Sequence, residues 1–167
     1  VGSKIGLPEE LSELSSGQYD VITMWHVLEH VHELNWTIEQ LKRLLKENGK
    51  LFIAVPNHHS FDARHYGSFW AAYDVPRHLY HFTPNTISLL MEKHGLKVIF
   101  KKAMWFDSFY VSMLSEKYKS GKINYFKAVA HVMPAKWVLM YVKKMAIDAH
   151  PRQNRKYKRE KQHHKAE

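Results

Sequence analysis

The 167-residue sequence has no cysteine, which excludes a disulfide-stapled scaffold and zinc sites built on thiolates. It also lacks any run of about 18 uncharged apolar residues, so no membrane-spanning helix is predicted. The first residues, VGSKIGLPEEL, have neither a basic start nor an apolar stretch, and we predict no signal peptide. What is present is 45% hydrophobic and 13% aromatic residues. This composition is sufficient for a packed core and favours one domain over a disordered chain.

The formal charge of +9 is concentrated at the C-terminal end. Residues 143–167 carry nine Lys or Arg against three Asp or Glu, while the rest of the chain is nearly neutral. We therefore predict a folded part over 1–144 and a basic, disordered tail over 145–167. Such a tail could bind nucleic acid or an anionic membrane. Because it lacks an apolar stripe, a solvated terminus is the favoured interpretation.

Hydrophobic patterning predicts an alternation of strands and helices. Apolar runs predict strands over 19–25, 51–55 and 96–100, the last running on towards 104, and a final run over 137–142 fits a strand or a helix. A short helix or turn is predicted over 7–16, and helices are predicted over 34–46, 83–94 and 109–118. Alternation of this kind indicates a parallel α/β sheet, in which ligands bind outside the carboxyl ends of the strands.

Local signals at the element ends sharpen this prediction. Thr83 and Pro84 are typical of a helix start, and Gly95 of its end. Gly49 is expected to end the helix over 34–46 as a left-handed cap. Residues 58–82 are predicted to form one long loop rich in histidine and aromatics.

Three segments carry a family resemblance: YDVITMWHVLEHV, LKENGKLFIAVPN and DVPRHLYHFTP. Together they resemble the second half of class I S-adenosylmethionine-dependent methyltransferases, in the small-molecule branch that includes quinone-biosynthesis O-methyltransferases. The resemblance covers about residues 5–118. In that family the strands containing YDVI, LFIAV and LKVIF are the fourth, fifth and sixth of seven, and the seventh is antiparallel. The resemblance thus favours a strand over 137–142.

The sequence departs from the family at the glycine-rich turn that contacts the cofactor. The family places a glycine-rich turn after its first strand and an acidic residue at the end of its second. The seven glycines here are residues 2, 6, 17, 49, 67, 95 and 121, and no two are close enough to form that turn. The predicted fold is therefore an α/β, incomplete Rossmann-like methyltransferase sheet that lacks its first strands, mostly parallel with a late antiparallel strand. We expect a truncated chain that is inactive alone.

The resemblance implies S-adenosylmethionine as the cofactor. Met24, Trp25 and His26 end the first visible strand, where the family lines its cofactor. Trp25 could pack against the adenine or methionine part of that molecule. Alternatively, it is a core aromatic beneath the following segment.

His26, Glu29 and His30 are spaced so that they face the same way on a helical turn. His26 or His30 could take a proton from an acceptor hydroxyl during methyl transfer, because the free imidazole pKa is near neutral. The related quinone methyltransferases carry a Glu where His26 stands, and there an acidic cluster can hold a divalent ion. Since magnesium prefers oxygen ligands, no metal site is predicted here. The remaining alternative is that Glu29 and His30 brace the loop onto the sheet.

A second group of candidates lies in the segment before Thr83. Arg77 could hold a carboxylate or phosphate of the acceptor, and His78 or His81 could act as a base. Tyr73 could contribute to an acceptor pocket. The alternative is that an Asp74–Arg77 pair orders the loop while His81 bonds to the backbone.

The sequence thus predicts a cytoplasmic enzyme that transfers a methyl group to a small-molecule or lipid-linked acceptor. Nucleic acid is not an expected partner, and the oligomeric state is left open. Two alternatives stay open as well. One is a binding module whose basic tail contacts nucleic acid or membrane, and the other is a non-catalytic fragment with an unpaired sheet edge.

Overall fold

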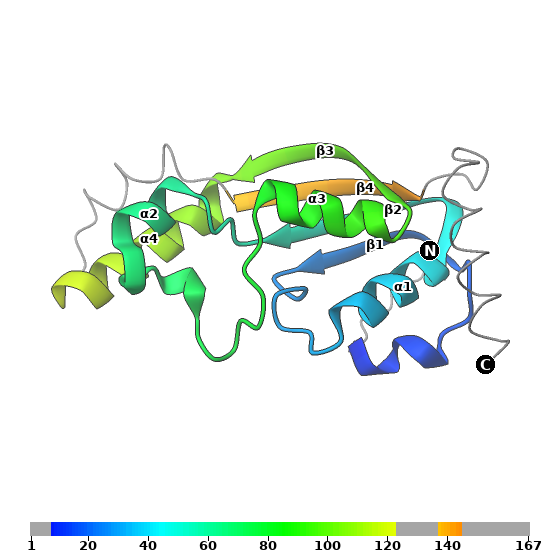
Figure 1. Ribbon diagram of the computed structural model, residues 1–167, viewed down its shortest axis with the longest axis horizontal. Coiled ribbons are helices and arrows are strands. Elements are labelled where there is room, and N and C mark those ends of the chain that lie inside the picture. Colours follow the sequence, from blue (N-terminus) through cyan, green and yellow to red (C-terminus); the bar gives the residue numbers. More distant parts are fainter. Residues whose placement is uncertain (1–7, 123–136, 145–167) are drawn as a thin grey trace, which may run out of the picture.

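The computed structural model describes residues 8–122 and 137–144 (Figure 1). Its helices are α1 (Leu34–Leu44), α2 (Phe61–Tyr66), α3 (Pro84–Lys93) and α4 (Trp105–Ser120). Its strands are β1 (Tyr19–Trp25), β2 (Leu45–Val55), β3 (Leu96–Met104) and β4 (Trp137–Lys144). Short 3-10 helices are η1 (Pro8–Glu13), η2 (Gly67–Phe69) and η3 (Ala71–Tyr73). The basic tail over 145–167 lies outside the described residues, and so does the division of the chain at residue 144.

The four strands form one sheet in the order β1-β2-β4-β3. β1 and β2 are parallel, and β4 runs antiparallel to both of its neighbours, β2 and β3. Three of the described strands therefore point the same way, and β4 is inserted between two of them (Figure 1). This arrangement confirms the predicted mostly parallel α/β sheet with a late antiparallel strand.

The predicted role of Gly49 as a left-handed helix cap is wrong. α1 ends at Leu44, and Leu45 is already extended, with φ −68° and ψ 137°. Gly49 lies within β2, where a Cβ atom would meet the Lys46 carbonyl oxygen at 2.9 Å and the Tyr19 carbonyl oxygen at 3.0 Å. The pairing of β1 with β2 is irregular at this point. Glycine is needed for close backbone approach at a bulge rather than for positive φ.

The start and end of α3 confirm the sequence signals. The Thr83 hydroxyl accepts from the Thr86 backbone N–H at 3.1 Å, and the Thr86 hydroxyl accepts from the Thr83 backbone N–H at 2.8 Å. This reciprocal pair satisfies two donors that a helix start otherwise leaves unpaired. Pro84 occupies the first turn, and Gly95 follows the helix with φ +69°.

The single long loop predicted over 58–82 is only partly correct. The segment folds into α2, η2 and η3 before it returns to an extended path. Ser60 caps α2 by accepting from the Ala63 backbone N–H at 3.0 Å. α4 also begins four residues earlier than the helix predicted from residue 109. These short elements lack the long hydrophobic period on which sequence recognition depends.

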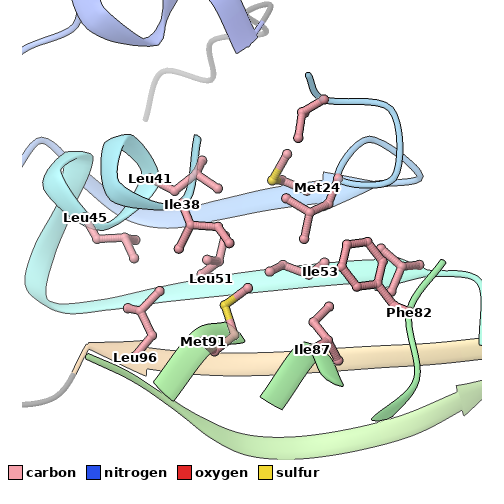
Figure 2. Packing of buried hydrophobic residues seen from close by; sticks show 13 residues of the cluster. Met24, Ile38, Leu41, Leu45, Leu51, Ile53, Phe82, Ile87, Met91 and Leu96 are labelled. Atoms are coloured by element: carbon pink, nitrogen blue, oxygen red, sulfur yellow. The ribbon is translucent and has the colours of Figure 1, made fainter. Parts of the chain in front are cut away.

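The main core lies between the sheet and helices α1 and α3 (Figure 2). It is made entirely of apolar side chains from β1, β2, β3, both helices and the connecting segments. Its buried members are Met24, Leu28, Val31, Ile38, Leu41, Leu45, Leu51, Ile53, Val55, Phe82, Ile87, Met91 and Leu96. Burial of this apolar surface is the main stabilising contribution to the sheet.

A second, smaller cluster lies beyond the carboxyl ends of β1, β2 and β3, where α2 and α4 pack (Figure 1). Its buried members are Ala63, Tyr66, Trp70, Ala72 and Val111. The Ser115 hydroxyl of α4 accepts from the Ala71 backbone N–H at 2.8 Å, which ties η3 to α4. Among the described helices, none has the length and apolar character that crossing a membrane requires.

Candidate functional site

The candidate site begins where β1 ends. His26 follows Trp25 with φ +54°, an uncommon backbone conformation for a residue with a side chain. Its backbone N–H donates to the Ala54 carbonyl oxygen of β2 at 3.0 Å, so the first residue after β1 is still held to the sheet. The turn that follows therefore leaves the sheet at a fixed place, at the carboxyl edge where open α/β sheets bind ligands.

A distant segment is fastened to this turn by backbone hydrogen bonds. The Glu29 carbonyl oxygen accepts from the Leu79 N–H at 2.8 Å and from the Tyr80 N–H at 3.2 Å. The Tyr80 hydroxyl donates to the His32 carbonyl oxygen at 3.1 Å. Residues about 50 positions apart in the chain are thus brought together, which places the two groups of sequence candidates in one site.

Glu29, His30 and His78 form the centre of this site. One ligand-type atom of each residue lies within 4.8 Å of the other two, and the two imidazole rings meet edge to face with centroids 4.6 Å apart. His30 Nδ1 donates to the Arg77 carbonyl oxygen at 3.0 Å, and His78 Nδ1 donates to the Ala72 carbonyl oxygen at 2.8 Å. A carbonyl oxygen can only accept, so both rings carry their proton on Nδ1 when neutral.

Burial shifts the titration of two members of this cluster. Glu29 is 0% exposed, and its burial raises the pKa of the carboxyl to about 7, although its own backbone and nearby His30 pull the pKa down. Burial lowers the pKa of His78, and the neighbouring His30 and His81 lower it further against the opposing effects of the Ala72 carbonyl and Asp74. The His78 ring is therefore a neutral imidazole near pH 7, with an electron pair on Nε2.

His26 lies between two carboxylates. Its Nδ1 is 3.8 Å from Glu29 Oε1, and its Nε2 is 3.4 Å from Asp107 Oδ2 of α4. The sequence prediction placed His26 beside Glu29 correctly but missed Asp107. Only the position of α4 over this edge of the sheet identifies Asp107, because no spacing in the sequence relates it to His26.

Arg77 and His81 make the contacts expected if they order the loop, with Arg77 paired to Asp74 and His81 bonded to the backbone. Arg77 Nε donates to Asp74 Oδ1 at 3.1 Å, and the Arg77 side chain is 76% exposed. His81 Nε2 donates to the Tyr73 carbonyl oxygen at 3.1 Å, with the two rings 5.3 Å apart. These contacts order the segment before α3. Acceptor binding by Arg77, His81 and Tyr73 stays a prediction.

The two residues that end β1 differ in exposure. Met24 is buried in the main core, where it packs with apolar side chains (Figure 2). Trp25 points to the other face of the strand and is 48% exposed. Of these two residues, Trp25 is thus the one with surface available to a ligand, and its large flat ring suits stacking.

Aromatic and imidazole rings continue from the centre of the site along the segment before α3. The ring centroids of His78 and His81 are 6.4 Å apart. The ring of Tyr73 lies next to that of His81, and the ring centroid of His58 is 5.6 Å from that of Tyr73. Burial lowers the pKa of His58, as do neighbouring His59 and His81. The row of rings offers flat ring surface beside the Glu29 cluster.

Comparison with known proteins gives a family for most of the folded part. The family profile described as "Methyltransferase domain" matches residues 6–100. A curated relative, the ubiquinone biosynthesis O-methyltransferase of Pelagibacter ubique, is 37% identical over 54 residues. That match covers 32% of this chain and 22% of the relative.

Two solved structures show the same fold at low sequence identity. The 1,6-didemethyltoxoflavin-N1-methyltransferase of Burkholderia thailandensis, solved with S-adenosylhomocysteine, is 16% identical with a TM-score of 0.50. The match covers 81% of this chain and 48% of that one. A possible histamine N-methyltransferase of Thermotoga maritima is 20% identical with a TM-score of 0.53, covering 78% of this chain and 58% of that one. The chain thus spans about half the length of these structures.

Proposed function

The chain belongs to the methyltransferase-domain family, and from this premise we propose that it takes part in methyl transfer from S-adenosylmethionine to a small-molecule acceptor. The observation that carries the proposal is the position of the Glu29, His30 and His78 cluster. It lies at the carboxyl edge of the sheet, where open α/β folds bind their ligands. A cytoplasmic location and a lipid-linked acceptor stay predictions.

The cofactor is proposed to lie against the end of β1. Trp25 offers an exposed aromatic face, and Met24 and His26 fix the strand end on either side of it. In S-adenosylmethionine the transferable methyl is bound to a sulfonium sulfur. When the methyl moves, the S–C bond breaks, its electron pair stays on sulfur as a thioether, and an acceptor oxygen or nitrogen forms the new bond.

The imidazoles supply the proton chemistry in this proposal. An acceptor hydroxyl must lose its proton as the new bond forms, and His30 Nε2 or His78 Nε2 is free to receive it, because Nδ1 of each ring is held by a carbonyl. His26 is less available, since both of its nitrogens face carboxylates. General base catalysis of this kind contributes about 10²–10⁴-fold to the rate.

Cofactor binding is the first test. Isothermal titration with S-adenosylhomocysteine should show binding to the full chain, and Trp25→Ala should weaken it by about tenfold, the loss of roughly one aromatic stacking interaction. Trp36→Ala is the matched control, since Trp36 is a partly exposed tryptophan on α1. Equal binding by both variants would contradict the cofactor position proposed here.

Transfer is tested with radiolabelled S-adenosylmethionine and a panel of phenolic and amine acceptors. His78→Ala should lower kcat by about 100-fold or more and remove the acidic limb of the pH profile, while S-adenosylhomocysteine binding is unchanged. His59→Ala, which removes an exposed imidazole in the same part of the chain, is the control. Unchanged kcat in His78→Ala and in His30→Ala would exclude both as bases.

A further inference from the structure

The two faces of the described sheet differ in what lies against them. α1 and α3 both pack on the face that holds the main core, and α2 and α4 lie beyond the carboxyl ends of the strands (Figure 1). The other face is called the open face below. In β1, Ile22 and Met24 face the core, so Val21 belongs to the open face, where it is 49% exposed. A ligand can therefore reach side chains on this face.

Three lysines from three neighbouring strands occupy one row of the open face. In the register of the sheet, Lys50 of β2 is opposite Lys143 of β4, and Lys143 is opposite Lys97 of β3. Lys50 precedes the buried Leu51, so the row lies on the side away from the main core. Strands are about 4.8 Å apart, and the three positions therefore span only about 10 Å. Like charges directly opposite one another destabilise a sheet, and an anionic ligand relieves that repulsion.

A row of three aromatic residues runs beside the lysine row. Phe52 of β2 is opposite Tyr141 of β4, which is opposite Phe100 of β3. The register shifts between Val98 and Phe100, and this bulge puts Phe100 on the same face as Lys97. Phe100 is 50% exposed, so its ring offers surface to a ligand.

The next residue of β3, Lys101, supports this assignment of faces. Its Nζ donates to the Pro84 carbonyl oxygen of α3 at 2.9 Å, on the side that the helices cover. Successive residues of a strand point to opposite faces, so Phe100 points away from α3. The bulge in β3 thus brings an aromatic ring to the open face.

The two rows combine the groups that bind a single strand of nucleic acid. Unpaired bases stack on aromatic rings, while positive side chains follow the phosphates. Some four-stranded sheets with helices on one face use aromatics of the other face in this way to bind RNA. The formal charge of +9 and the basic sequence that follows Lys144 add long-range attraction for a polyanion. Aligned rings beside the lysines favour a ligand with bases over a purely electrostatic partner.

We propose that the open face binds single-stranded nucleic acid, with Phe100 stacked on a base and Lys50 and Lys97 in contact with phosphates. This binding does not rest on the proposed methyl transfer. The Glu29 cluster lies at the carboxyl edge of the sheet, whereas Lys97 is near the start of β3. Sequence patterning did not predict such a partner, because each row combines residues from three strands that are distant in the chain.

The first test is fluorescence anisotropy of the full chain with a labelled oligouridylate of about 12 nucleotides, a length typical of single-strand binding sites. Phe100→Ala should weaken binding at least about fivefold, the loss of one stacked base. Phe69→Ala is the matched control, since Phe69 of η2 is 46% exposed and lies outside the sheet. The control should retain the wild-type affinity.

The lysine row is tested by salt dependence. The logarithm of the affinity for a single strand falls with the logarithm of the salt concentration, with a slope of about 0.7 for each phosphate neutralised. Between about 50 and 200 mM NaCl, Lys97→Gln should lower the affinity and reduce this slope by about 0.7. Lys117→Gln removes an exposed lysine of α4 and should leave the slope unchanged.

Three results would overturn the proposal. Wild-type affinity in Phe100→Ala would mean that binding comes from charge alone. Equal affinity for oligouridylate and for an RNA duplex of the same length would exclude stacking on unpaired bases. Binding to phosphatidylglycerol vesicles that Lys97→Gln weakens, without binding to oligouridylate, would assign the open face to a lipid surface. Circular dichroism checks the folding of each variant, and if Phe100→Ala does not fold, Lys97→Gln and the duplex comparison decide.

Discussion

The main core and the α2–α4 region are built on different chemistry. The main core, between the sheet and helices α1 and α3, is a continuous cluster of buried apolar side chains. The α2–α4 region buries Asp62, Ser108, Ser112, Ser115 and Glu116 beside its aromatics. The first region depends on packing and is indifferent to pH, whereas the second depends on hydrogen bonds and charge. The second also carries the segment that brings His78 to the site, through the Ser115 contact with η3.

The largest expected effect is in the main core. Leu51 of β2 is fully buried, so Leu51→Ala should lower the free energy of unfolding by about 3 kcal/mol through lost burial and a cavity. Urea denaturation at pH 7 and at pH 9 measures it. The loss should be the same at both pH values, and a pH-dependent loss would erase the contrast between the two regions. Leu89→Ala, at an exposed leucine of α3, is the control.

The α2–α4 region should respond to alkaline pH instead. Burial, reinforced by nearby Glu116 and Asp62, raises the pKa of Tyr66 to about 12. Between pH 10 and pH 12 the unfolded chain loses this proton and the folded chain keeps it, so stability falls as pH rises, by about 2.7 kcal/mol at most. The difference in unfolding free energy between wild type and Tyr66→Phe isolates this slope. A constant difference across that range would contradict the pKa.

Hydrogen bonding in the α2–α4 region is tested by Ser112→Ala. The Ser112 hydroxyl donates to Asp62 Oδ2 at 2.6 Å inside the protein. Its removal leaves a buried carboxylate with one donor fewer, which costs about 2 kcal/mol. Ser68→Ala, at an exposed serine of η2, should change stability by less than about 0.5 kcal/mol. Equal effects of the two variants in thermal denaturation would show that the buried bond contributes nothing.

The smallest expected loss of stability is at the start of α3, one of the helices that cover the main core. Thr83→Ala removes the side-chain acceptor at the start of α3 and should cost about 1 kcal/mol. Thr83→Ser retains the hydroxyl and should cost much less. Chemical denaturation of the two variants measures the difference. A larger loss for Thr83→Ser than for Thr83→Ala would rule out capping as the reason.

Local sequence signals were sufficient to predict an element whose own residues specify its secondary structure. The continuous apolar run of β2 and the Thr83-Pro84 start of α3 each identified an element from a few residues. Gly49 was misinterpreted because a helix cap and a bulge both select glycine, and only the approach of the Tyr19 carbonyl distinguishes them. α2 and the 3-10 helices were missed since six residues or fewer carry no measurable period.

The candidate site residues also divide into those that local spacing could place and those that only long-range contacts could place. The spacing of His26, Glu29 and His30 placed them together, because neighbours in one turn cannot be far apart. The addition of His78 to that group, and the position of Asp107 opposite His26, depended on contacts between segments about 50 and 80 residues away.

The sequence by itself determined the order of strands and helices and the turn that carries Glu29. Tertiary structure alone decided that β4 inserts between β2 and β3, and that Glu29 is buried without a hydrogen-bond donor among the described residues beside two oriented imidazoles. The physical reason is that backbone preference and hydrophobic period act over a few residues. Burial, desolvation and the orientation of a ring are set by whatever the folded chain brings alongside.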